Sequence, residues 1–199
     1  MNRPAHLPDF TDPPLDEVVL GVQFAPVSSF SAVHALDVWN LFRKEFPTVE
    51  EQPLIEPNFE TFGGANVPSG PTFHVGAPPV GSRLWFLSED GNHLLQFQRD
   101  RFILNWRRRP NAQPYPRFEG LAEAFYANIL TLNEHLLKTF DHRMEINQAE
   151  VAYINVIPVD DFSDIGNWLK IWSGAGFGIE GLNTNINEVV FGEDRKPFA

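Results

Sequence analysis

Cysteine is absent from this 199-residue chain. The absence excludes disulfide bonds, thiolate metal sites and a cysteine nucleophile, and it fits a reducing compartment. No uncharged apolar run approaches the ~20 residues that span a bilayer. The opening MNRPAHLPDFTDPP is polar and proline-rich, without the apolar segment of a secretory signal. We therefore expect a soluble, cytoplasmic protein that does not bind membranes.

Basic residues are also scarce. The chain has 15 Lys and Arg residues against 26 Asp and Glu residues, which gives a formal net charge of −11. Nucleic acid and anionic membranes repel so acidic a chain, so neither is an expected partner. The exception is one window, residues 99–109, which holds five arginines.

Hydrophobic residues make up 43% of the chain, enough for a substantial core. A valine-rich stretch after Pro13-Pro14 predicts a strand over residues 17–24. Ser31 is placed to cap a helix that ends near Phe46-Pro47. The apolar stripe of this helix is predicted to consist of Val33, Leu36, Val38, Trp39, Leu41 and Phe42.

Residues 47–81 contain seven prolines and several glycines, so regular structure is hard to sustain there. We expect only a short strand at 72–75. Ordered connections of this length are uncommon in compact domains, and those that occur are often functional or mobile.

The segments RLWFL, HLLQFQ and RFILNW predict an antiparallel meander between residues 83 and 106. Asp90-Gly91 marks the first turn, because glycine accepts the positive φ that hairpin turns require. A tight turn around Arg99-Asp100 forms the second. Apolar and polar residues alternate along these strands, which predicts that one sheet face has few helices.

The longest helix is predicted over residues 118–140 and should cover one face of the sheet. Its apolar residues recur every three or four positions. They are Phe118, Leu121, Phe125, Ile129, Leu132, Leu136 and Phe140.

EVAYINVIPVDDFS at 150–163 resembles EVVLGVQFAPVSSFS at 17–31, since both combine a strand, a proline exit and a serine before a helix. This pattern indicates an internal duplication; a chance match between two strand-to-helix transitions is the alternative. The predicted fold is α+β. An antiparallel meander sheet is covered by helices. The chain is built from two related strand-helix units: residues 1–149, and an incomplete second unit, residues 150–199, that shares the sheet.

An incomplete second unit predicts self-association through residues 150–199, because unpaired strand edges recruit other chains. In the alternative, the short unit completes the sheet of the first and the monomer is closed. A further strand is expected at 188–191.

The segments LPDFTDPPLDEVVLGVQF, FPTVEEQP, RLWFLSEDGNHLLQFQRDRFILNWRR and EVAYINVI carry a family resemblance. Across most of residues 7–156 the chain resembles a sporadically distributed, functionally uncharacterised family of bacterial proteins, whose members are typically longer. The resemblance implies a bacterial cytosolic origin. It implies no activity, cofactor or catalytic residue.

No catalytic motif is predicted. GAGFGIEG at 174–181 follows a predicted helix rather than a strand, so its glycines are interpreted as loop residues and not as a nucleotide-binding fingerprint. The six histidines form no metal-binding spacing, and no G-x-S-x-G nucleophile elbow occurs. We expect no cofactor and no metal.

The arginine window is the best candidate for a binding site. Guanidinium groups beside a tryptophan suit anion binding and stacking, and Arg107 and Arg109 would share a face if their strand continued. The alternative is a strand edge protected from aggregation by its charges. The candidate binding residues are Arg99, Arg101, Trp106, Arg107 and Arg109.

Two functions are consistent with these patterns. The first is a non-catalytic binding protein that recognises another protein, such as the product of a neighbouring gene in an antitoxin or defence pairing. The second is a small-ligand-binding protein with a cavity between the sheet and the 118–140 helix. Enzymatic activity is the less expected outcome.

Overall fold

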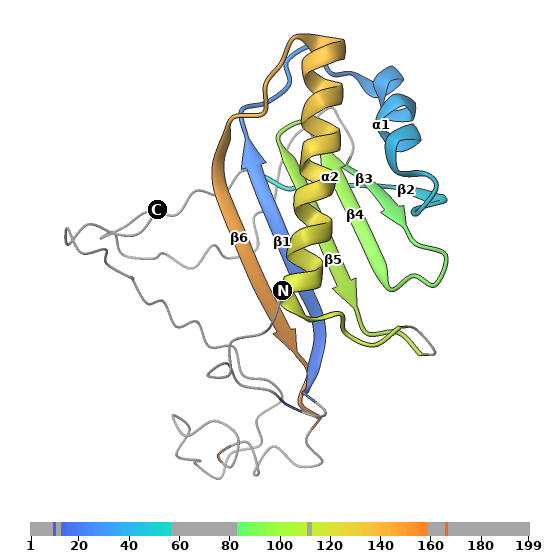
Figure 1. Ribbon diagram of the computed structural model, residues 1–199, viewed down its shortest axis with the longest axis vertical. Helices are drawn as coiled ribbons and strands as arrows, with labels where there is room; N and C mark the ends of the chain where they lie inside the picture. Colours follow the sequence, from blue (N-terminus) through green and yellow to red (C-terminus); the bar gives the residue numbers. More distant parts are fainter. Residues whose placement is uncertain (1–9, 11–12, 57–82, 111–112, 159–165, 167–199) are drawn as a thin grey trace, which may run out of the picture. The chain divides into compact units, whose positions relative to one another are not determined.

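The computed structural model describes residues 10, 13–56, 83–110, 113–158 and 166. Within them, a six-stranded antiparallel sheet has the order β2-β3-β4-β5-β1-β6 (Figure 1). The strands are β1 (Leu15–Phe24), β2 (Thr48–Gln52), β3 (Arg83–Leu87), β4 (His93–Gln98), β5 (Arg101–Arg107) and β6 (Ile146–Asn155). The helices are a short 3-10 turn, η1 (Ala32–His34), and α1 (Ala35–Phe42) and α2 (Arg117–Phe140).

The predicted α+β class and antiparallel sheet are confirmed. The internal duplication is not confirmed. Its predicted second helix and the strand at 188–191 lie outside the described residues, as does the strand expected at 72–75.

The meander β3-β4-β5 forms where the sequence predicts it. Gly91 has a φ of 67° in the first turn, a left-handed conformation that glycine adopts without strain. Arg99 and Asp100 alone connect β4 to β5. Asn92 closes the end of the hairpin by donating from its side-chain amide to the Arg107 carbonyl oxygen.

The sheet has a helix-covered face and an opposite face, because successive side chains of a strand point to opposite sides. α2 packs on β1 and β5, and α1 packs on β3 and against α2 (Figure 1). The buried apolar side chains of the strands meet the helices on this covered face. They include Val18, Leu20, Val22, Phe86, Leu95, Phe97, Phe102, Leu104 and Trp106.

The long helix α2 confirms the predicted stripe except at its start. Leu121, Phe125, Leu132 and Leu136 are buried, whereas Phe118 is 38% exposed. The Phe125 ring stacks on Phe102 with ring centroids 5.9 Å apart. The helix therefore closes the core over the centre of the sheet.

The stripe predicted for residues 33–42 is wrong at its first two positions. Val33 is 79% exposed and Leu36 is 58% exposed, while Val38 and Phe42 are buried. The cause is η1, because a 3-10 turn advances fewer residues per turn than an α-helix and shifts the phase of the stripe. Ser31 precedes η1 as expected, with its backbone N–H donating to His34 Nδ1 (3.0 Å).

β2 is a strand that the sequence analysis missed. It lies at the start of the proline-rich segment and pairs with β3, with Val49 opposite Phe86. The five residues between Pro47 and Pro53 contain no proline, so the ladder can form there.

In the described part of the chain, no helix is both long and apolar enough to cross a membrane.

We expect the protein to lose stability as the pH falls below about 6.5, the ordinary pKa of histidine. Burial lowers the pKa of His93, and the nearby carboxylates of Asp90 and Glu45 oppose this effect only in part. Between the lowered pKa and 6.5 the unfolded chain binds more protons than the folded chain. The free energy of unfolding therefore decreases as the pH falls through this range.

Urea unfolding of the wild type and of His93→Gln at pH 7.5 and pH 5.5 measures this contribution. The variant should lose less stability between the two values. His135, whose pKa burial also lowers, should contribute a loss in the same direction in both proteins. An identical loss in both proteins would contradict the assignment to His93.

Candidate functional site

The arginine window does not form one site. β5 ends at Arg107, so Arg109 does not continue the alternation and does not share a strand face with it. Arg101 and Arg107 lie on the opposite face, whereas Trp106 points to the covered face and is 3% exposed. Arg99 is exposed in the β4–β5 turn. The predicted residues thus fall in four places: the opposite face, the covered face, the β4–β5 turn and the segment after β5.

The opposite face carries a hydrogen-bonded polar chain across four strands. Asn105 donates from Nδ2 to Glu17 Oε1 (2.6 Å), and Gln96 donates from Nε2 to Asn105 Oδ1 (2.7 Å). Gln96 Oε1 accepts from Arg83 Nη1 (2.8 Å) and from Trp85 Nε1 (3.0 Å). Gln96 and Asn105 are buried, so these bonds offset the cost of removing two amides from water.

Trp85 is the aromatic partner of the arginines on this face. The guanidinium carbons of Arg83 and Arg107 lie 5.4 Å and 6.0 Å from its ring centre. Burial lowers the pKa of both arginines, and neighbouring Arg101 and Arg109 add to the effect on Arg83 and Arg107 respectively. The sequence alone did not identify Trp85 as this partner. Trp85 is distant in sequence from the arginine window, and only the pairing of β3, β4 and β5 brings it near Arg107.

Arg101 sits at the edge of a small cavity of about 190 Å³ on the same face, formed by residues of β1, β6 and the segment after β2. Its Nη2 donates to Gln23 Oε1 (2.5 Å). Beside it, the Gln98 side chain holds the backbone of Ile55 by two hydrogen bonds, donated by Ile55 N (3.0 Å) and by Gln98 Nε2 (2.9 Å). Arg101 Nε, by contrast, is buried and has no hydrogen-bond partner among the described residues.

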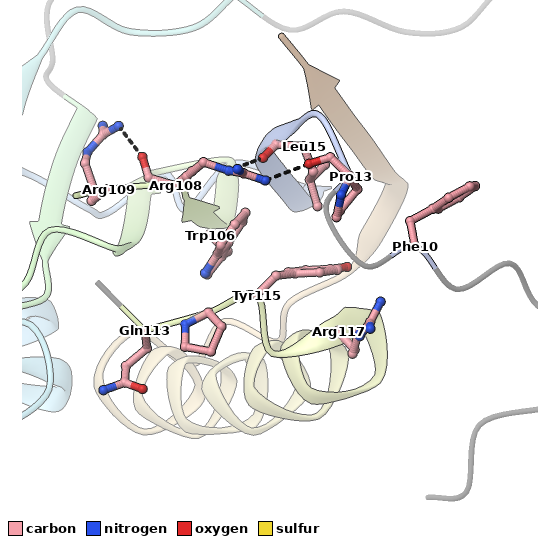
Figure 2. A pocket seen from close by; sticks show the side chains of 10 residues that line it. Phe10, Pro13, Leu15, Trp106, Arg108, Arg109, Gln113, Tyr115 and Arg117 are labelled. Atoms are coloured by element: carbon pink, nitrogen blue, oxygen red, sulfur yellow. Dashed lines mark hydrogen bonds between the residues drawn. The ribbon is translucent and has the colours of Figure 1, made fainter. Parts of the chain in front are cut away.

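A larger cavity of about 330 Å³, the sheet-end pocket, lies where β1 begins, β5 ends and α2 starts (Figure 2). Arg108 donates to the carbonyl oxygens of Leu15 (2.8 Å) and Pro13 (2.7 Å) and so fixes one wall. The lining residues are Phe10, Pro13, Leu15, Trp106, Arg108, Arg109, Gln113, Pro114, Tyr115 and Arg117.

Two aromatic side chains of this pocket carry unsatisfied polar atoms. The rings of Trp106 and Tyr115 are 5.0 Å apart between centroids. Trp106 Nε1 and Tyr115 Oη are buried and have no hydrogen-bond partner among the described residues. Burial raises the pKa of Tyr115, and the nearby Tyr153 hydroxyl raises it further without reaching hydrogen-bond geometry. The Tyr115 hydroxyl therefore keeps its proton.

The two edges of the sheet differ in protection. β2 is five residues long, carries Glu50 and Glu51, and is followed by Pro53. Short length, charge and proline are the usual means of blocking an edge. β6 has ten residues, no proline and a single charge, Glu150, whose side chain lies across Gly21 of β1.

β6 also exposes large apolar side chains. Ile146, Val151, Tyr153 and Ile154 are each at least 42% exposed. Within the described residues β6 pairs only with β1, so its outer backbone groups face away from the sheet.

No grouping of three or more His, Asp or Glu residues suited to a metal ion is found among the described residues. The glycine-rich segment 174–181 lies outside them. Comparison with family models, curated proteins and solved structures finds no match to this chain, so the resemblance to a bacterial family stays a prediction.

Proposed function

We propose that this chain is a non-catalytic binding protein that recognises another protein by adding an extended segment of it to β6. The observation that supports this function is the contrast between the two sheet edges. β2 has the features that prevent pairing, whereas β6 is long, nearly uncharged and apolar.

Strand addition also sets the chemistry of the partner. The main chain of β6 supplies the hydrogen bonds, and its exposed side chains select alternate residues of the added segment. Val151 and Tyr153 lie on the covered face, opposite Leu20 and Val18. The expected partner is therefore a segment with apolar residues at alternating positions. It should contain few acidic residues, because the net charge of −11 would repel them.

Two proline variants test this function. Successive backbone N–H groups of a strand point to opposite edges, so of Val151→Pro and Ala152→Pro one removes a bond to β1 and the other an outward N–H. We expect one variant to be unstable. The other should keep the stability of the wild type and lose binding to peptides selected from a displayed random library.

Amide hydrogen exchange on the full chain identifies what occupies the edge. The proposal requires a monomer whose outward β6 amides exchange freely and become protected by a selected peptide. Protection in the isolated monomer would assign the edge to residues 156–199 of the same chain. Protection that rises with protein concentration would assign it to a second copy. Either result overturns the proposal, as does a peptide that binds equally to both proline variants.

Glu50→Pro and Glu51→Pro are the matched controls on β2. They place the same pair of changes on the other edge strand, and peptide binding should be unaffected in whichever of them stays folded.

A further inference from the structure

The small cavity of about 190 Å³ on the opposite face, here called the Arg101 cavity, has groups of both charges in its lining. Its polar residues come from the neighbouring strands β5, β1 and β6 and from the segment after β2 (Figure 1). They are Gln23, Glu56, Arg101, Gln148 and Glu150. Gln23 of β1 lies opposite Arg101 of β5 and opposite Gln148 of β6, so these three side chains form one row across the sheet.

The Arg101 guanidinium is oriented by neutral acceptors. Its Nη2 donates to Gln23 Oε1 (2.5 Å) and, at a longer distance, to the Glu56 carbonyl oxygen (3.4 Å). Gln23 is 6% exposed, and its Nε2 donates in turn to Asn147 Oδ1 (3.4 Å). Arg101 Nη1 makes no hydrogen bond within the described residues. The guanidinium is therefore held in position while its charge and one of its nitrogens remain available to a ligand.

Gly21 makes room for a carboxylate on the other side of this row. The Glu150 side chain lies across Gly21, where an added Cβ would be 2.8 Å from Glu150 Oε1 and 2.9 Å from its Cγ. A glycine weakens the interior of a strand, and it occurs where another group approaches the backbone closely. In the described part of the chain, Glu150 forms neither a hydrogen bond nor an ion pair.

The charges of the lining select the class of ligand. One guanidinium, of Arg101, and two carboxylates, of Glu56 and Glu150, line the cavity. The carboxylates repel a simple anion and the guanidinium repels a simple cation, whereas a molecule with both charges can pair with both. The volume is below the roughly 300–1,000 Å³ of cavities that hold drug-sized ligands, so the ligand must be small.

We propose that the Arg101 cavity binds a small free α-amino acid. The carboxylate of the ligand accepts from Arg101 Nη1, and its ammonium group donates to Glu150. The half-buried Gln148 amide lies in the lining and can bond to either group. This inference is independent of strand addition, which uses the outer backbone groups of β6.

Three probes of similar size test the need for both charges. Alanine carries a carboxylate and an ammonium group, propionate lacks the ammonium group, and ethylamine lacks the carboxylate. Each is titrated into the ¹⁵N-labelled full chain while the amide signals of Gly21 and Gln23 are followed. Alanine should shift them to saturation. Propionate and ethylamine should bind at least about tenfold more weakly, because each loses one charge-assisted hydrogen bond.

Two variants locate the ammonium group. Glu150→Gln keeps the shape of an exposed side chain and removes its charge, so alanine binding should weaken by about tenfold and its advantage over propionate should disappear. Gly21→Ala should have a similar effect, because the added methyl group displaces the Glu150 side chain. Glu51→Gln removes the same charge from an exposed position on β2 and should leave the affinity for alanine unchanged.

Thermal unfolding of each variant separates loss of binding from loss of folding. Should Gly21→Ala fail to fold, Glu150→Gln alone decides. Three results would each overturn the proposal: no saturable shift with alanine, equal affinities for alanine and propionate in the wild type, or equal losses of alanine binding in Glu51→Gln and Glu150→Gln.

Discussion

Replacing Phe125 with alanine is expected to lower the free energy of unfolding by about 3–5 kcal/mol. Phe125 is 7% exposed and stacks on Phe102, whose ring also lies 5.8 Å from that of Phe42. Removing the ring leaves a cavity between α2, β5 and α1. The surrounding side chains are held by the sheet and can collapse only in part, so the transfer and cavity costs add.

Urea unfolding compares Phe125→Ala with Phe118→Ala, which removes the same atoms from the same helix. Phe118 is 38% exposed, so its loss should be about 1 kcal/mol or less, in the range of surface substitutions. Similar losses in the two variants would show that the face of α2 centred on Phe125 does not pack on the sheet.

The second large effect is expected at Gln96, in the polar chain of the opposite face. Gln96→Met keeps the approximate shape of the side chain and removes both of its hydrogen-bonding groups. Arg83, Trp85 and Asn105 then lose a partner, and Asn105 is 4% exposed and has little access to water. We expect a loss of about 2–3 kcal/mol, because a buried polar group left unpaired bears its full desolvation cost.

Gln52→Met is the control for Gln96→Met. Gln52 lies on the edge strand β2, and among the described residues its side chain makes only a long hydrogen bond of 3.5 Å to Glu50. Its replacement should change the free energy of unfolding by about 0.5 kcal/mol or less. If Gln96→Met costs no more than Gln52→Met, the polar chain contributes nothing to stability.

Local patterns determined what the sequence could predict. The meander and α2 were predicted because their turns and apolar repeats involve neighbouring residues, such as Asp90-Gly91 and the spacing of Leu121 and Phe125. The position of β1 between β5 and β6 depends on pairing between distant residues, for example Leu20 with Leu104 and Val151. No local signal specifies such a pairing.

The candidate site was predicted only in part for the same reason. Composition pointed to the arginine window, but the strand pleat and the end of β5 at Arg107 divided it. Trp85 and Tyr115, the residues that complete the two arginine environments, lie outside the window. Their roles follow from three-dimensional neighbours that a linear reading of charge cannot provide.

The place of β1 between β5 and β6 has a consequence for synthesis. Among the described strands β1 leaves the ribosome first, yet both of its partners are encoded much later, β5 starting at Arg101 and β6 at Ile146. At about 5–20 residues per second, its apolar side chains stay without a partner for several seconds or more. The nascent chain therefore passes through a stage in which this apolar strand has neither of its neighbours, a condition that favours aggregation. Only completion of β6 gives that strand both of its neighbours.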